Sequence, residues 1–180
     1  EQAPLNTAAA SLIAKASWVH VDQVGIKRLD EMGIKRGHGP KISFDAGYGV
    51  EKFDASLVDL FAPTDKAMEL RHPGKSLKES LRADCSGNIV AATRGSKGSA
   101  AFSEIEGYVE ALGFSVEVVS TLGAGDVFHG AFLAQIIQGR KLDEALIRAN
   151  AVAALSCKGL DGQSAIPTTI ELEQFLKERK

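Results

Sequence analysis

Residues 120–126 carry the sequence Ser-Thr-Leu-Gly-Ala-Gly-Asp, and this stretch decides how the rest of the chain is interpreted. It follows a valine-rich segment that predicts a short strand, Ser115–Val119, and precedes an apolar segment that predicts a buried helix, Val127–Gln138. Gly123 and Gly125 let the backbone turn tightly, so unpaired N–H groups at the helix start can converge on an anion. The stretch therefore predicts a phosphate-binding turn at a helix N-terminus.

A carboxylate, Asp126, ends the stretch. It would repel a phosphate unless its task is to take a proton from a hydroxyl that attacks a phosphoryl group. The alternative is that Asp126 only caps the following helix, a common position for Asp. Capping alone leaves Gly123 and Gly125 unexplained, so we favour the catalytic interpretation.

Strands and helices alternate through the first half of the chain. Apolar runs predict strands at residues 18–21, 41–44 and 88–93, and helical periodicity predicts helices at residues 7–15, 25–34 and 64–70. Parallel neighbours need a crossover, usually a helix, so this order predicts a mainly parallel sheet covered on both faces. Further short strands are predicted at residues 99–102, 108–112 and 115–119, and further helices at 127–138, 142–156 and 169–178. The sequence thus predicts one α/β domain over residues 1–180, a three-layer sandwich with an antiparallel edge.

The composition favours a globular protein with a small soluble partner. The 180 residues are 44% hydrophobic, and 21 basic against 23 acidic residues leave a net charge of −2. That balance predicts no binding to nucleic acid or to an anionic membrane. Cys85 and Cys157 lie far apart, and no apolar run is long enough to span a bilayer, so we expect a cytoplasmic location. The oligomeric state stays open, a homo-oligomer included.

Residues 120–133, STLGAGDVFHGAFL, resemble the second signature of the ribokinase-like, PfkB-type carbohydrate kinases, whose usual form is D-T-x-G-A-G-D-x-F. The resemblance implies that Asp126 is the catalytic base. It also implies that the backbone of Gly123, Ala124 and Gly125 stabilises the transferring phosphoryl group.

Two further segments match the nucleotide site of that family. Residues 93–98, Thr-Arg-Gly-Ser-Lys-Gly, have the T-x-G-x-x-G form that wraps the phosphates of ATP. Without the resemblance, the same glycine turn would only join two strands. Asn150 matches an Asn on the helix beside the adenine. The implied nucleotide-binding residues are Thr93, Gly95, Lys97, Gly98 and Asn150.

The resemblance implies ATP and Mg²⁺ as cofactors, bound as Mg·ATP, but the metal ligands stay unknown. Thr64 and Ala67 stand where the family has an Asn and a Glu that organise the metal. Asp65 or Glu69 could supply a carboxylate through water, because Mg²⁺ keeps several waters. Ser120 replaces the first Asp of the signature, which leaves open the monovalent-cation site that the family often builds there.

These implications predict an ATP-dependent kinase that phosphorylates an alcohol of a small molecule, a sugar or sugar derivative. The resemblance covers about Trp18 to Pro167. The family's N-terminal region, with its sugar-binding glycines and β lid, has no counterpart, so we interpret the chain as a C-terminal portion that is inactive alone.

Two alternatives from other classes stay open. A nucleotide-binding regulatory module, in effect a pseudokinase, would explain Thr64 and Ala67. A Rossmann-type dehydrogenase is disfavoured because no G-x-G-x-x-G joins the first strand to the first helix. The histidines show no zinc-binding spacing, and His129 is interpreted as a packing or capping residue.

Overall fold

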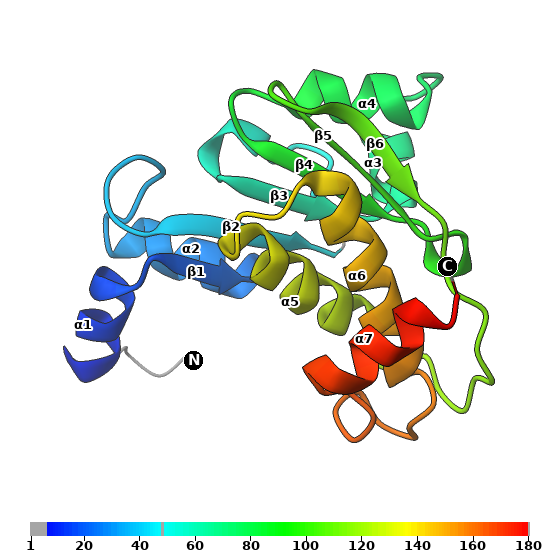
Figure 1. The fold of residues 1–180 in the computed structure, drawn as a ribbon. Helices are drawn as coiled ribbons and strands as arrows, with labels where there is room; N and C mark the ends of the chain where they lie inside the picture. Colours follow the sequence, from blue (N-terminus) through cyan, green and yellow to red (C-terminus); the bar gives the residue numbers. More distant parts are fainter. Residues whose placement is uncertain (1–6, 48, 180) are drawn as a thin grey trace.

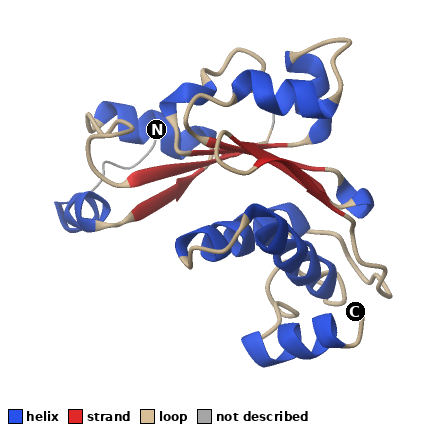
Figure 2. Ribbon diagram, turned by 45° about the horizontal axis from the view of Figure 1, so that its top comes forward, coloured by secondary structure: helices blue, strands red, loops and turns tan. Residues whose placement is uncertain are grey.

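In the computed structural model, which describes residues 7–47 and 49–179, a six-stranded sheet separates two layers of helices (Figures 1 and 2). The strands are β1 (Trp18–Val21), β2 (Lys41–Ala46), β3 (Leu60–Pro63), β4 (Ile89–Thr93), β5 (Ser99–Ser103) and β6 (Gly107–Ala111). The helices are α1 (Thr7–Lys15), α2 (Gln23–Glu31), α3 (Asp65–Arg71), α4 (Leu77–Asp84), α5 (Ala124–Ile137), α6 (Leu142–Ser156) and α7 (Thr169–Lys177), with short 3₁₀ helices η1 (Ala55–Leu57) and η2 (Gly95–Lys97). The predicted three-layer α/β sandwich is confirmed.

The strands of the sheet follow the order of the chain, β1-β2-β3-β4-β5-β6. β1 to β4 are parallel, whereas β5 and β6 join as antiparallel hairpins. Every residue of β3 is buried, the pattern of a strand covered on both faces. The mainly parallel sheet with an antiparallel edge agrees with the sequence-based prediction.

Helices α2, α3 and α4 pack on one face of the sheet around a core that includes Phe44, Phe61, Met68, Leu81 and Val90. Each helix begins at a capping side chain: Asp22, Thr64 or Ser76. The Asp22 cap starts α2 two residues earlier than its helical periodicity indicates. Helix α4 was not predicted, although Ser76 and Glu79 form the capping box that marks its start.

Helices α5 and α6 cover the opposite face, and α7 packs on the outside of α6 (Figure 2). The side of α5 that faces the sheet and α6 is buried through Phe128, Phe132 and Leu133, whereas Gly130 and Ile137 are exposed. The helix is followed by Gly139, whose left-handed backbone, φ +73°, ends the helix as predicted. Among the described residues, no helix is both long and apolar enough to cross a membrane.

Residues 115–119 do not form the predicted strand. They run as irregular chain from the sheet edge to the layer of α5. Their end is tied to α6, because the N–H groups of Val119 and Ser120 donate to the carbonyl oxygen of Cys157 at 2.9 and 3.1 Å. Val116 packs in the cluster between α6 and α7. The need to leave the sheet and reach α5 overrides the strand preference of these residues.

Candidate active site

Helix α5 has the glycine turn at its N-terminus, as the sequence predicts, but it begins at Ala124, three residues before the predicted start at Val127, so Gly125 and Asp126 lie in its first turn. Gly123 is the N-cap residue and has a left-handed backbone, φ +75°. A Cβ atom there would lie 2.9 Å from the Cα atom of Gly162, so the close approach of a second loop also requires glycine. The turn is thus held between the helix and the loop at residues 161–166.

Gly125 has a different reason to be glycine. Its backbone is ordinary, and among the described residues no heavy atom beyond its own helix lies within 4 Å of a Cβ built there. Helix geometry leaves the N–H groups of Gly125 and Asp126 without an intrahelical partner, while the Ala124 N–H donates to Thr121 O at 3.2 Å. Empty space and unpaired donors at the positive end of a helix form a cradle that fits a phosphoryl oxygen.

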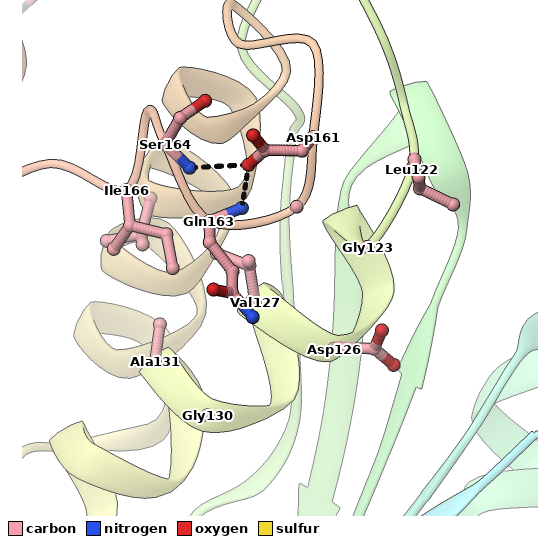
Figure 3. A pocket seen from close by; sticks show the side chains of 12 residues that line it. Leu122, Gly123, Asp126, Val127, Gly130, Ala131, Asp161, Gln163, Ser164 and Ile166 are labelled. Atoms are coloured by element: carbon pink, nitrogen blue, oxygen red, sulfur yellow. Dashed lines mark hydrogen bonds between the residues drawn. The ribbon is translucent and has the colours of Figure 1, made fainter.

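Asp126 is the third residue of α5, and its side chain is exposed. The N-cap position is occupied by Gly123, so Asp126 does not cap α5 from that position, although a carboxylate in the first turn still interacts favourably with the helix dipole. Asp126 belongs to the lining of the cavity between α5 and the loop at residues 161–166 (Figure 3), and is not part of the lining of the cavity described next. Asp126 thus lies exposed in the first turn of α5, next to Gly125, and its role as a base stays a prediction.

A cavity of about 340 Å³ opens beside the cradle, within the size range of small-molecule sites. It lies between η2, the segment after β6, and helices α5 and α6. Its lining includes Gly125 and four of the residues implied to bind nucleotide: Thr93, Gly95, Gly98 and Asn150. Lys97 is exposed in η2 and does not belong to this lining. The structure thus gathers at one cavity segments that are far apart in the sequence.

Close backbone packing fixes the turn at residues 95–98. Gly98 has φ +96°, and a Cβ atom there would lie 2.1 Å from the carbonyl oxygen of Ala111. A Cβ atom on Gly113 would lie 2.4 Å from the carbonyl oxygen of Ser96. Sequence reasoning missed Gly113, because no local motif marks a glycine required by a distant segment.

Asn150 is buried on α6 and ties that helix to the sheet. Its Oδ1 accepts a hydrogen bond from Ser99 Oγ at 2.9 Å, and its Nδ2 donates to Ala111 O and Leu112 O at 3.1 and 3.2 Å. The side-chain amide therefore positions the cavity wall. Its contact with adenine stays a prediction.

A second cavity, of about 950 Å³, lies between α5 and the loop at residues 161–166 (Figure 3). Asp161 shapes this loop by accepting hydrogen bonds from the N–H groups of Gln163 and Ser164, both at 2.7 Å. These backbone donors, Ser164 first, hold the pKa of the Asp161 carboxyl below its usual value. The loop that contacts Gly123 is therefore ordered by its own carboxylate.

The metal side of the site departs from the family motif. Thr64 Oγ1 caps α3 by accepting from the Ala67 N–H at 3.1 Å, and Thr64 also bridges to Thr93 at the end of β4. Ala67 is buried and offers no side-chain oxygen. The carboxylates of Asp65 and Glu69 line a separate cavity of about 460 Å³. Within residues 7–47 and 49–179, no group of three or more His, Cys, Asp or Glu could hold a metal ion.

His129 is buried, as a packing residue would be, but it also belongs to a polar cluster that sequence reasoning missed. Its Nδ1 atom lies 2.7 Å from Oδ2 of Asp45 on β2. The two residues are far apart in the sequence, so no local pattern signals the contact.

A three-layer α/β fold with a glycine turn and a helix N-terminus beside a cavity is an arrangement that is suited to bind a phosphate. The family model described as pfkB family carbohydrate kinase matches residues 51–169. The chain belongs to this family. The dehydrogenase alternative is thereby set aside.

Two curated carbohydrate kinases are similar in sequence to this chain. The ATP-dependent ribose-1-phosphate kinase of Halopiger xanaduensis is 33% identical over 145 residues, which cover 78% of this chain and 48% of that protein. The ribokinase of Haemophilus influenzae is 31% identical over 130 residues, 68% of this chain and 42% of that protein. This chain therefore spans about half the length of the curated relatives it matches.

Two solved structures share the fold. A putative ribokinase from Agrobacterium tumefaciens superimposes with a TM-score of 0.81 at 23% identity, over 99% of this chain and 60% of that one. A putative ribokinase II from E. coli, in complex with ATP and Mg²⁺, gives a TM-score of 0.75 at 21% identity, over 94% and 61%.

Proposed function

We propose that this chain is the nucleotide-binding and catalytic portion of an ATP-dependent kinase that phosphorylates an alcohol of a sugar or sugar derivative. One observation carries the proposal: at the start of α5, Gly125 keeps an empty cradle open to the cavity, and the next residue, Asp126, presents an exposed carboxylate. The names of the relatives, a ribokinase and a ribose-1-phosphate kinase, support a sugar-like acceptor.

The proposed chemistry follows from these two neighbouring groups. Asp126 takes the proton of the acceptor hydroxyl, and the hydroxyl oxygen forms a bond to the terminal phosphorus of ATP. At the same time, the bond between that phosphorus and the leaving ADP breaks. The N–H groups at Gly125 and Asp126 stabilise the charge on the transferring phosphoryl oxygens, because they are oriented before the reaction begins. Mg²⁺, bound with ATP, supplies neutralisation of the phosphate charge.

The cavity wall supports binding of the rest of the nucleotide. The turn at residues 95–98 lies beside the cradle, and its fixed backbone favours close approach of phosphates. Asn150 and the apolar residues Phe114 and Val116 line the same cavity, which suits a flat base. Lys97, which is exposed and outside the cavity lining, would contact only phosphates that extend beyond the wall.

A regulatory module that binds ATP without transferring phosphate is the second candidate. The observation that favours it is the use of Thr64 as a helix cap, together with the absence of a carboxylate at buried Ala67. Both candidates predict nucleotide binding, and only the first predicts turnover.

The test separates binding from transfer. Titration calorimetry of residues 1–180 with Mg·ATP measures binding, and transfer of labelled γ-phosphate to D-ribose, D-fructose or ribose 1-phosphate is measured on the complete polypeptide that carries this chain. We expect binding and transfer to at least one sugar. Binding without transfer to any of them would favour the regulatory module, and no binding would contradict both candidates.

A further inference from the structure

The lining of the nucleotide cavity falls into two chemically different parts. The two glycine turns supply a polar part, with the hydroxyl side chains of Thr93, Ser96 and Thr121 close in sequence to the glycines. The segment after β6 and the second half of α6 supply what we call the apolar part: Phe114, Val116, Val118, Ala153, Ala154 and Cys157. The polar part suits phosphates, which leaves the apolar part for the base of a nucleotide.

Asn150 brings an amide side chain to this lining, but its hydrogen-bonding groups are already used. Its Nδ2 atom donates to the carbonyl oxygens of Ala111 and Leu112, and these two bonds occupy both of its hydrogens. Its Oδ1 atom accepts from Ser99 Oγ. Asn150 therefore has no N–H left for a ring nitrogen or a carbonyl oxygen of a base.

Two backbone carbonyl groups on the α6 side of the apolar part are occupied as well. The Cys157 carbonyl oxygen accepts from the N–H groups of Val119 and Ser120 at 2.9 and 3.1 Å. The Ala153 carbonyl oxygen accepts from Ser156 Oγ and Cys157 Sγ at 2.9 and 3.2 Å. A carbonyl oxygen has two lone pairs, so two bonds satisfy each of these groups. The amino group of adenine finds no free acceptor in either of them.

With these groups occupied, the cavity wall selects a base by its size and flatness. Adenine carries an amino group at position 6, where guanine carries a carbonyl oxygen, so hydrogen bonding at that edge distinguishes two rings of nearly the same shape. A site that makes such a bond rejects the wrong ligand by about 10⁴- to 10⁵-fold, whereas an apolar site rejects a near-isosteric ligand far less strongly.

We propose that the apolar part holds a purine ring by apolar contact without reading its hydrogen-bonding edge, so that GTP and ITP serve as phosphoryl donors alongside ATP. This inference rests on the proposed kinase function. Asn150 is then a positioning residue, which holds α6 against Ser99 of β5 and Ala111 of β6. A pyrimidine has a single ring and buries less apolar surface, so pyrimidine nucleotides bind more weakly.

The test is a calorimetric titration of residues 1–180 with Mg·ADP, Mg·GDP, Mg·IDP and Mg·CDP. We expect the Kd values of the three purine nucleotides to agree within about tenfold, or about 1.4 kcal/mol. Mg·CDP should bind at least about fivefold more weakly than Mg·ADP. Diphosphates lack the transferred group, so the titration measures binding of the base independently of phosphoryl transfer.

Phe114→Leu tests whether apolar contact holds the base. Loss of the aromatic ring is expected to weaken all three purine diphosphates by the same factor, about fivefold or more. Leu160→Ala is the control, because Leu160 is 77% exposed and lies outside the lining, and its Kd values should stay within about twofold. Phe114 also packs edge to face on Phe175 of α7. If Phe114→Leu does not fold, Val118→Ser at the exposed rim of the cavity provides the same comparison.

Asn150→Ser separates positioning from base recognition. It removes the bonds to Ala111 and Leu112, so Tm should fall, while the ratio of the Kd values for Mg·ADP and Mg·GDP should stay within about twofold of the unsubstituted chain. A selective loss of Mg·ADP binding in this variant would show that Asn150 reads adenine, and would overturn the inference.

The titration distinguishes this inference from the proposed function. A preference for Mg·ADP over Mg·GDP and Mg·IDP of more than about tenfold would mean that the cavity reads the base edge, and would overturn the inference while the kinase proposal stands. Mg·CDP that binds less than about fivefold more weakly than Mg·ADP would show that the apolar part does not hold the base. Failure of all four nucleotides to bind would overturn both proposals.

Discussion

Replacing Gly125 by Ala tests whether the empty cradle at the start of α5 serves a phosphoryl group. The new methyl group meets no heavy atom within 4 Å in the described residues beyond its own helix, and the backbone of Gly125 is one that Ala adopts freely. Ala in place of Gly within a helix stabilises by about 0.5–1 kcal/mol. For a domain of this size we expect Tm to rise by about 1–4 °C.

Nucleotide binding should change in the opposite direction. The methyl group occupies the space assigned to a terminal phosphoryl oxygen, which would lose one hydrogen bond to a charged group, worth about 1.5–3 kcal/mol. The Kd for Mg·AMP-PNP should therefore rise by roughly 10- to 150-fold. ADP lacks the transferred group, so its Kd should change much less.

Gly130→Ala is the matched control. Gly130 lies on the same helix, and a Cβ there also meets nothing within 4 Å among the described residues, but it lines the second cavity (Figure 3). Its Tm should rise similarly while its nucleotide affinities stay within about twofold. Calorimetric titration and thermal unfolding of both variants provide the comparison. Equal affinity for Mg·AMP-PNP in the Gly125 and Gly130 variants would refute the cradle.

Three further predictions concern stability, pH and reactivity. Asp84→Asn should lower the free energy of unfolding in urea by about 3–5 kcal/mol, because it leaves the Arg71 guanidinium buried without its charged partner; a loss below about 1 kcal/mol would contradict this. Because the pKa of His20 is lowered in the folded state, the unfolded chain binds more protons than the folded chain as the pH falls below 6.5, and the free energy of unfolding should decrease there. His20→Gln should flatten that part of the pH profile of stability measured in urea. Burial raises the pKa of the Cys157 thiol, so iodoacetamide should react with it slowly at neutral pH. Because Cys157 lines the nucleotide cavity, Mg·ATP should protect Cys157 but not Cys85 from this reaction. If Mg·ATP leaves Cys157 unprotected, the nucleotide binds elsewhere.

The fold was largely predictable because its elements have strong local patterns. The apolar run of β4 and the all-round apolar helix α5 identify themselves by period and length. Helix α4 escaped prediction because its apolar face is short, although the Ser76 capping box marks its start. Residues 115–119 have strand-forming side chains but follow a path set by the distance between the sheet edge and α5.

The candidate site was predictable only where a single segment defines it. The glycine turn at the start of α5 is local, so its place at a helix N-terminus follows from the sequence. The contact of Gly123 with Gly162, the hydrogen bonds of Asn150 and the approach of His129 to Asp45 join segments distant in the sequence. Such contacts depend on the assembled fold, and no periodicity or spacing in the chain encodes them.

The role of Asp126 is the central claim, and Asp126→Asn in the complete polypeptide tests it most directly. The substitution is nearly isosteric and leaves the helix N-terminus intact, while it removes the group that accepts the hydroxyl proton. General-base catalysis contributes about 10²- to 10⁴-fold, so kcat should fall by at least about 100-fold while the Kd for Mg·ATP stays within about threefold. Near-full turnover by the Asn variant, with any value of Kd, would contradict the assignment of Asp126 as the base.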